Sequence, residues 1–394
     1  MIFYPMVISA VAVLVTLVYA SYLDIRDRRV PFRTWYPMLV VGISATIVLF
    51  YQQTGNISLI VGYLTLIASF LYADYLDNRD PKIPFRFPYL AAVLALPAIS
   101  WFIIPAASTG KLSELQLIPW YVLFAGLLGY ISYREYKKQP VKKLTAKQIR
   151  KDAAMKESTI EEVLSRWYFV LVIVILAIAS FYMIGGGSWG VSGIYIALAA
   201  VFCGVFYIFG QMHLFGGADA WALIFIAFCI PTFPFTPLLN TPPLGFLSFS
   251  VLINALILNL IAPVGIFIIN IVKGNRAPLQ YMFFGFPVKG EAIQDSWGFV
   301  MEDFTETKGT VERKFIGFWD SLRRMRSEEG RVYTKDLREH PEEYEKELGI
   351  YKKAGSVWIS YAVPFILPIT AGLITAIVCG DFLLAIITFI TGGA

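Results

Sequence analysis

Residues 19–33 read YASYLDIRDRRVPFR, an apolar segment that ends at Asp24 and continues into a turn rich in arginine. The pattern returns at residues 72–86 as YADYLDNRDPKIPFR, where Asp77 takes the place of Asp24. Aromatic and arginine side chains of this kind anchor a helix end at the headgroup depth of a membrane, and the proline stops the helix. The repeat therefore predicts a duplicated two-span hairpin that delivers an aspartate of each copy to the same membrane face.

The composition of the chain is that of a membrane protein. Of its 394 residues, 57% are hydrophobic and only 15% are charged, and the mean hydropathy is +0.64. These values lie far from those of a soluble domain. Because one span takes about 20 apolar residues, we predict an all-α polytopic fold with about ten transmembrane helices and a small cytoplasmic α(+β) subdomain before the last one. The predicted spans are 2–22, 36–51, 57–76, 87–104, 119–133, 167–184, 191–210, 219–231, 247–272 and 357–379, and apolar residues 381–394 leave a further partial span open.

Charge and hydropathy divide the chain into five predicted parts. These are a transmembrane region at 1–133 with the duplicated hairpin, a basic cytoplasmic loop at 134–166, a transmembrane region at 167–272, a cytoplasmic subdomain at 273–356, and a C-terminal transmembrane helix with a tail at 357–394. Basic residues follow the first and third predicted spans, so by the positive-inside rule these turns are cytoplasmic and the N-terminus is outside. Counting spans from there places Asp24, Asp77 and Asp219 at the cytoplasmic face.

Neither the cysteines nor the histidines indicate a metal or cofactor. Cys203, Cys229 and Cys379 lie in separate apolar runs, and His213 is far from His340. This spacing predicts no zinc site and no disulfide framework. The net charge of +5 is modest and spread over loops, so nucleic acid is not an expected partner, whereas membrane lipid is.

The aspartates at the apolar boundaries are the candidate functional residues. A carboxylate near hydrocarbon is costly, so it is a functional-site hypothesis by default. Asp219 ends the sequence Gly216-Gly217-Ala218-Asp219 at such a boundary. Two carboxylates at one face can share a proton and act on one water, as in an aspartyl protease. The repeat gives Asp24 and Asp77 equal surroundings, so either is a candidate partner for Asp219.

These residues resemble the archaeal branch of the type IV prepilin peptidase family, the GxGD membrane aspartyl proteases that include the preflagellin peptidases. The resemblance implies that Asp24 is the first catalytic residue, because the basic turn and Pro31 follow it, and that Asp219 is the second. Gly216, Gly217 and Ala218 then shape the motif, although Ala218 stands where the family pattern has glycine. A second stretch, from 284–288 through 357–366 to Asp381, is similar to the C-terminal part of archaeal preflagellin peptidases.

The resemblance also implies a function. We expect an aspartic endopeptidase of the cell membrane that removes the short basic leader from type IV pilin-like precursors, each with a hydrophobic helix, at the cytoplasmic face. An archaellin precursor is the alternative substrate, and the sequence leaves the oligomeric state open. No cysteine-rich loop is present, so we expect proteolysis without methylation.

Two other classes of function remain as alternatives. An ion- or proton-coupled transporter also carries intramembrane acids, but transport places them near the midplane between inverted halves. Here the two copies of the repeat run in the same direction, which favours chemistry at one face. A non-enzymatic assembly factor for surface filaments is the third reading, and it would tolerate loss of either aspartate.

Overall fold

The computed structural model describes residues 3–55, 57–77, 84–103, 118–137, 190–211, 216–307, 310–317, 319–320, 332–360 and 364–392. The chain forms two compact units. One, which we call the helical unit, comprises Met1–Lys143, Ser158–Leu256 and Phe365–Ala394, and the other, the α/β unit, comprises Leu144–Glu157 and Ile257–Pro364.

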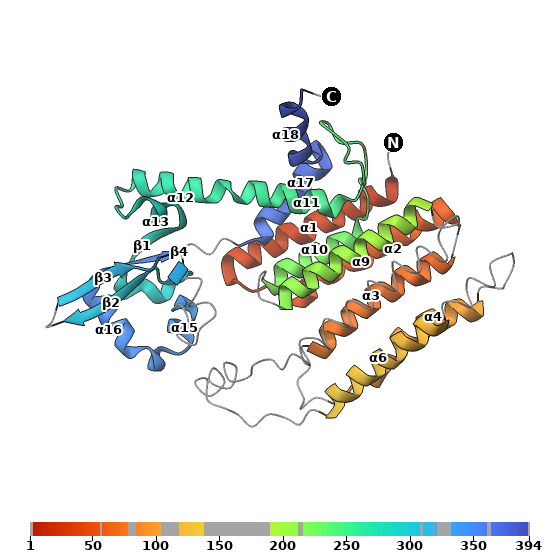
Figure 1. Cartoon of the computed structure of the whole chain (residues 1–394), viewed down its shortest axis with the longest axis horizontal. Coiled ribbons are helices and arrows are strands. Elements are labelled where there is room, and N and C mark those ends of the chain that lie inside the picture. Colours follow the sequence, from red (N-terminus) through yellow and green to blue (C-terminus); the bar gives the residue numbers. More distant parts are fainter. Residues whose placement is uncertain are drawn as a thin grey trace. The chain divides into compact units, whose positions relative to one another are not determined.

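The helical unit is built on long apolar helices (Figure 1). Its described elements are α1 (Tyr4–Asp27), η1 (Phe32–Trp35), α2 (Tyr36–Thr54), α3 (Ile57–Asp77), α4 (Phe87–Ile103), α6 (Ile118–Lys137), α9 (Gly190–Gln211), α10 (Gly217–Cys229), the start of α11 (Leu247–Asn259), α17 (Ile366–Cys379) and α18 (Phe382–Ile390).

Helix α1 shows why these helices suit a membrane. It buries Met6, Ala10, Val13, Leu17 and Ala20, which recur every three or four residues and therefore form one stripe. The opposite side is also apolar and yet exposed, with Ile8, Val11, Val15 and Val18. A helix that is apolar on all sides but buried on only one has its other side suited to lipid rather than water.

Helix α10 lies at the centre of this unit. It packs against α1, α2, α9 and α17, and every residue from Ala222 to Cys229 is fully buried. Its 13 residues extend over about 20 Å, less than the hydrocarbon thickness of about 30 Å. The predicted span at 219–231 is therefore a short central helix, not a candidate span.

Hydroxyl groups from three helices satisfy the C-terminal carbonyls of α10. The Cys229 oxygen accepts hydrogen bonds from Ser9 Oγ at 2.6 Å and Thr46 Oγ1 at 2.9 Å, and the Phe228 oxygen accepts one from the Tyr63 hydroxyl at 2.5 Å. The last carbonyls of a helix have no partner within it. Their donors here come from α1, α2 and α3, which fixes these helices around the end of α10.

The described part of the chain contains five helices long and apolar enough to cross a membrane: Tyr4–Asp27, Phe32–Thr54, Leu59–Leu76, Val191–Gly210 and Leu247–Val272. A sixth is possible by length if α17 and α18, bent by 55°, count as one span. The mostly helical membrane fold is confirmed, but the prediction of ten spans is not. The predicted span at 167–184 lies outside the described residues.

A buried asparagine holds the break between α17 and α18. Asn254 Nδ2 donates to the Gly380 carbonyl at 2.8 Å, and Asn254 Oδ1 accepts from the Phe382 N–H at 2.9 Å. Gly380 has a φ of 99°, which L side chains rarely adopt, so glycine suits this bend. Asp381 then caps α18 by accepting from the Leu384 N–H at 3.0 Å.

The α/β unit contains α12 (Ile261–Val272), α13 (Leu279–Phe284), β1 (Gly285–Lys289), η2 (Gly290–Asp295), β2 (Glu302–Thr307), β3 (Thr310–Phe315), α15 (Thr334–Glu339), η3 (Pro341–Glu343), α16 (Glu345–Ala354) and β4 (Ser356–Ser360). Strand β1 pairs antiparallel with β4, from Gly285 opposite Ser360 to Lys289 opposite Ser356, and β2 pairs antiparallel with β3. The core holds Ile293, Val300, Leu337, Tyr351, Val357 and Ile359.

Strand β4 corrects the start of the predicted last span. Hydropathy joined Val357-Trp358-Ile359 to the apolar residues after them, and the sequence therefore predicted a helix over 357–379. These β-branched and aromatic residues instead form a strand that pairs with β1, Val357 and Ile359 enter the core of the α/β unit, and the helix begins only at Ile366.

Gly42 of α2 provides a test of the packing around α10. A Cβ at this position would overlap the Cβ and Sγ atoms of Cys229, whereas one at Gly126 of α6 would meet nothing within 4 Å. We expect Gly42→Ala to lower the free energy of unfolding by about 1–3 kcal/mol through overpacking. Gly126→Ala, the control, should be neutral or slightly stabilising. The measurement is thermal unfolding of the detergent-solubilised protein, and equal midpoints for the two variants would contradict the predicted overlap.

Glu302 provides a second test, in the α/β unit. The residue is only 3% exposed, and its carboxylate accepts a hydrogen bond from the Trp358 N–H at 2.8 Å. Burial raises the pKa of this carboxyl, against the opposing effects of that N–H and of Arg313. Its favourable contribution to stability is therefore fully present below the unfolded-state pKa of about 4.3 and is lost as the pH rises through the folded-state pKa.

Glu302→Gln keeps an acceptor for Trp358 but does not ionise. We expect the amide-exchange protection of β1 and β4, corrected for intrinsic rates, to fall more in the wild type than in this variant between about pH 4 and pH 8. The exposed Glu312 on the neighbouring strand supplies the control, Glu312→Gln, which should follow the wild type. Identical pH profiles for the wild type and Glu302→Gln would show that Glu302 stays in one charge state across this range.

Candidate active site

Asp24 lies in the last turn of α1 and is half-buried. Its carboxylate accepts a hydrogen bond from the backbone N–H of Ile366, the first residue of α17. The first N–H groups of a helix have no partner within it and carry the positive end of the helix dipole. The start of α17 therefore orients and stabilises a negative charge on Asp24.

Asp219 is the third residue of α10, and it too is half-buried. Its carboxylate accepts a hydrogen bond from the backbone N–H of Gly216, the N-cap of the same helix. This is the second half of a capping box, in which the side chain at the third helical position reaches back to the N-cap N–H. The local sequence thus fixes the direction of the Asp219 side chain.

The three residues before Asp219 show why this motif consists of small residues. A Cβ at Gly216 would lie 2.6 Å from Asp219 Oδ2, so a side chain there would have to displace the capping carboxylate. At Gly217 a Cβ would meet nothing within 4 Å. Ala218 lies within α10 and has no positive φ, so alanine suits the position where the family pattern has glycine.

The structure brings Asp24 and Asp219 together. The charge of Asp24 acts on the Asp219 carboxyl, and α1, which carries one acid, packs against α10, which carries the other. Pro31 is the N-cap of η1, and the next residue, Phe32, places its ring 5.8 Å from the Trp221 ring of α10. The turn after Asp24 is therefore held against the helix of Asp219.

Asp77 is the last residue of α3, and its side chain lies outside the part of the chain that the structure describes. His213 lies outside the described residues as well. The alternative pairing of Asp77 with Asp219 therefore stays a prediction. Among the described residues, no group of three or more His, Cys, Asp or Glu side chains is placed to hold a metal ion.

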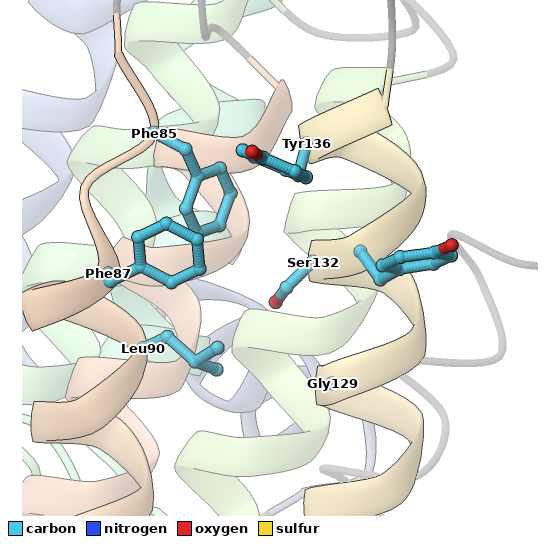
Figure 2. Close-up of a pocket in the computed structure, with 7 residues that line it drawn as sticks. Phe85, Phe87, Leu90, Gly129, Ser132 and Tyr136 are labelled. Atoms are coloured by element: carbon cyan, nitrogen blue, oxygen red, sulfur yellow. The ribbon is translucent and has the colours of Figure 1, made fainter.

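A cavity of about 230 Å³ lies elsewhere in the helical unit (Figure 2). Its lining comes from the turn before α4 and from α4 and α6, and consists of Phe85, Phe87, Leu90, Gly129, Ser132, Tyr133 and Tyr136. Figure 2 shows the rings of Phe85 and Phe87 facing α6, which carries Tyr136. None of these residues is an acid, so the cavity lacks the chemistry that the two aspartates offer.

Sequence reasoning did not identify the backbone partner of Asp24. Ile366 is separated from Asp24 by most of the chain, and no local pattern connects the two. The only signal was the stretch around Pro364 and Phe365, which the resemblance marked as family-like. A proline just before a helix is a common start signal, but the predicted span over 357–379 ran through Pro364, so neither the helix start at Ile366 nor its contact with Asp24 was predicted.

Two neighbouring carboxylates at the ends of apolar helices are typical of membrane proteins whose site is a pair of acids. Comparison with known families indicates which family this chain resembles. Residues 11–74, which include Asp24, match the model of the Type IV leader peptidase family. Residues 277–382 match the model described as Archaeal Peptidase A24 C-terminus Type II. The predicted resemblance to archaeal prepilin and preflagellin peptidases is confirmed by these matches, which indicate a protease.

Asp219 lies between the two matched segments and is covered by neither. A comparison with curated protein sequences gave no match. The roles of individual residues therefore rest on the geometry described above.

The two glycines of the motif provide a matched test. Gly216→Ala places a methyl group against Asp219 Oδ2 and should displace the carboxylate, so we expect peptidase activity to fall by at least about 10-fold. Gly217→Ala meets nothing within 4 Å and should keep activity within about 2-fold of wild type. Activity per mole of protein in membranes is the measurement. Equal activity of the two variants would show that the Asp219 contact with Gly216 does not matter for function.

Proposed function

We propose that this protein is a membrane-embedded aspartyl endopeptidase that removes the leader peptide from type IV pilin-like precursors, with Asp24 and Asp219 as its catalytic pair. The observation that carries the proposal is the electrostatic proximity of the two half-buried acids, one of which lies in the segment matched to the Type IV leader peptidase family. An archaellin precursor remains the alternative substrate.

The pair suits hydrolysis of an amide through water. Two neighbouring carboxylates do not both ionise readily, so together they hold one proton near neutral pH. The ionised carboxylate accepts a proton from water as the water oxygen attacks the scissile carbonyl carbon, and the protonated one donates to the carbonyl oxygen. As the tetrahedral intermediate collapses, the C–N bond breaks and the amine leaves with the proton that the first carboxylate had taken.

The helix ends that carry the acids support cleavage close to a membrane surface. Asp24 is near the end of a candidate span, and the basic residues that follow it favour the cytoplasmic face by the positive-inside rule. We propose that the hydrophobic helix of the precursor stays in the lipid beside these helices while its basic leader remains in the cytoplasm. The bond between them then reaches the level of Asp24 and Asp219.

A transporter is not favoured. Both acids lie at helix ends rather than in the middle of an apolar helix, where a proton or ion path would place them. The family matches are to peptidases in both segments.

The test is cleavage of a co-expressed pilin-like precursor in membranes, followed as a mobility shift. We expect Asp24→Asn and Asp219→Asn each to lower the rate by at least about 10²-fold, because each removes one of the two proton-transfer groups. Asp27→Asn is the matched control, because Asp27 is exposed, lies one turn from Asp24 and is paired with Arg26. It should cleave at the wild-type rate.

Asp77→Asn decides between the two copies of the repeat. Cleavage at the wild-type rate by Asp77→Asn, with loss in the Asp24 and Asp219 variants, assigns the pair as proposed. Loss in the Asp77 and Asp219 variants but not in Asp24→Asn would move the active site to the second copy. Wild-type rates in all these variants at equal expression would end the protease proposal.

A further inference from the structure

Arg28 has an unusual backbone conformation directly beside the candidate site. Its φ is 53° and its ψ is 25°, the left-handed region, and among the described residues it is the one non-glycine residue with a positive φ. Its N–H nevertheless donates to the Asp24 carbonyl at 3.1 Å, as in a continuing helix. The chain thus turns away after Arg28 while Arg28 itself stays one turn from Asp24, on the same face of α1.

The Arg28 side chain is directed inward rather than to solvent. It is half-buried, and its positive charge acts on the Asp24 carboxylate. Its Nε atom is buried and has no hydrogen-bond partner within the described part of the chain. A left-handed residue at a helix C-cap is usually glycine, and a buried N–H without a partner is costly, so an arginine here calls for an explanation other than the end of the helix.

The neighbouring Arg26, unlike Arg28, has an exposed and paired side chain. Arg26 is exposed, and its guanidinium binds the Asp27 carboxylate through two hydrogen bonds of 2.9 Å and 2.6 Å. Its charge is therefore matched by a surface acid. Arg28, two residues further on, makes no described ion pair of that kind, and its charge is available to Asp24.

The two copies of the internal repeat differ at the position of Arg28. When Asp77 is aligned with Asp24, Arg79 aligns with Arg26, but Pro81 takes the place of Arg28. Proline has no charge, and its ring fixes φ near −65°, so it cannot adopt the left-handed conformation of Arg28. Proline at position 81 therefore supplies neither the charge nor the left-handed conformation that Arg28 has in the first copy, although the basic Lys82 follows it.

We propose that Arg28 is a positioning residue of the peptidase site, which keeps Asp24 ionised and oriented so that Asp24 is the base that activates water and Asp219 is the acid. A cation beside one carboxylate of a pair favours the charged form of that carboxylate, and the shared proton then resides on the other. The inference rests on the proposed function. It also gives a reason why Asp24, rather than Asp77, is the partner of Asp219.

The experiment compares arginine variants in the purified full-length protein with a pilin-like precursor. Arg28→Gly removes the charge at a position whose φ suits glycine, so the backbone is not strained by the change. We expect kcat to fall by at least about 10-fold with KM within about 2-fold, because the charge acts on Asp24 and not on the precursor. Arg28→Lys, which keeps the charge, should retain more activity than Arg28→Gly.

Chemical rescue separates a charge role from a packing role. Millimolar ethylguanidinium should raise the kcat of Arg28→Gly by several-fold and leave the wild type unchanged. Arg26→Gln is the matched control, since Arg26 is a neighbouring arginine whose charge is bound by Asp27, and it should cleave at the wild-type rate. Wild-type kcat in Arg28→Gly, or an equal loss in Arg28→Lys and Arg28→Gly without rescue, would overturn the inference.

The same assay distinguishes this inference from the proposed function. If Asp24→Asn and Asp219→Asn are inactive and Arg28→Gly cleaves normally, only the role of Arg28 fails. If both aspartate variants cleave at the wild-type rate, the proposed function fails, and the inference about Arg28 fails with it.

Discussion

The carbonyl groups at the end of α10 impose the constraint on which the helical unit depends. Without water nearby, an unpaired backbone carbonyl costs several kcal/mol, so a buried helix end must find donors. Ser9, Thr46 and Tyr63 supply them from α1, α2 and α3. Because these hydroxyls bind one end of a short, fully buried helix, they also fix where its other end lies, and that end carries Asp219.

Unpaired backbone groups at helix ends also orient the two acids, but here the backbone N–H is the donor and the side chain is the acceptor. At the start of a helix the N–H groups lack partners, and a carboxylate is the natural acceptor. Asp219 accepts from Gly216 within its own helix, and Asp24 accepts from Ile366 of a different helix. Each acid is thus oriented by a backbone donor that a side-chain substitution cannot remove, which favours a pair with fixed geometry.

The two copies of the repeated segment differ in what surrounds their aspartates. The two copies share an aspartate, a basic turn and a proline, but only the first is described with its acid near Asp219 and with a left-handed arginine beside it. The second copy leads into the turn before α4, beside the aromatic cavity of α4 and α6 (Figure 2). The two repeated segments differ in sequence at the position of Arg28, which is Pro81 in the second copy.

The sequence by itself determined the membrane class, the repeated segment and the acids worth testing, because hydropathy, basic turns and proline act locally and can be read in order along the chain. It also indicated the peptidase family through short motifs that include Asp24. Tertiary structure alone decided that Gly217–Cys229 form a short central helix and that Ser356–Ser360 form a strand. It also decided that Ile366 donates to Asp24 and that Arg28 turns inward. Each of these depends on which distant segment supplies a partner for a buried polar group or an apolar side chain, and a linear sequence does not contain that information in any local pattern.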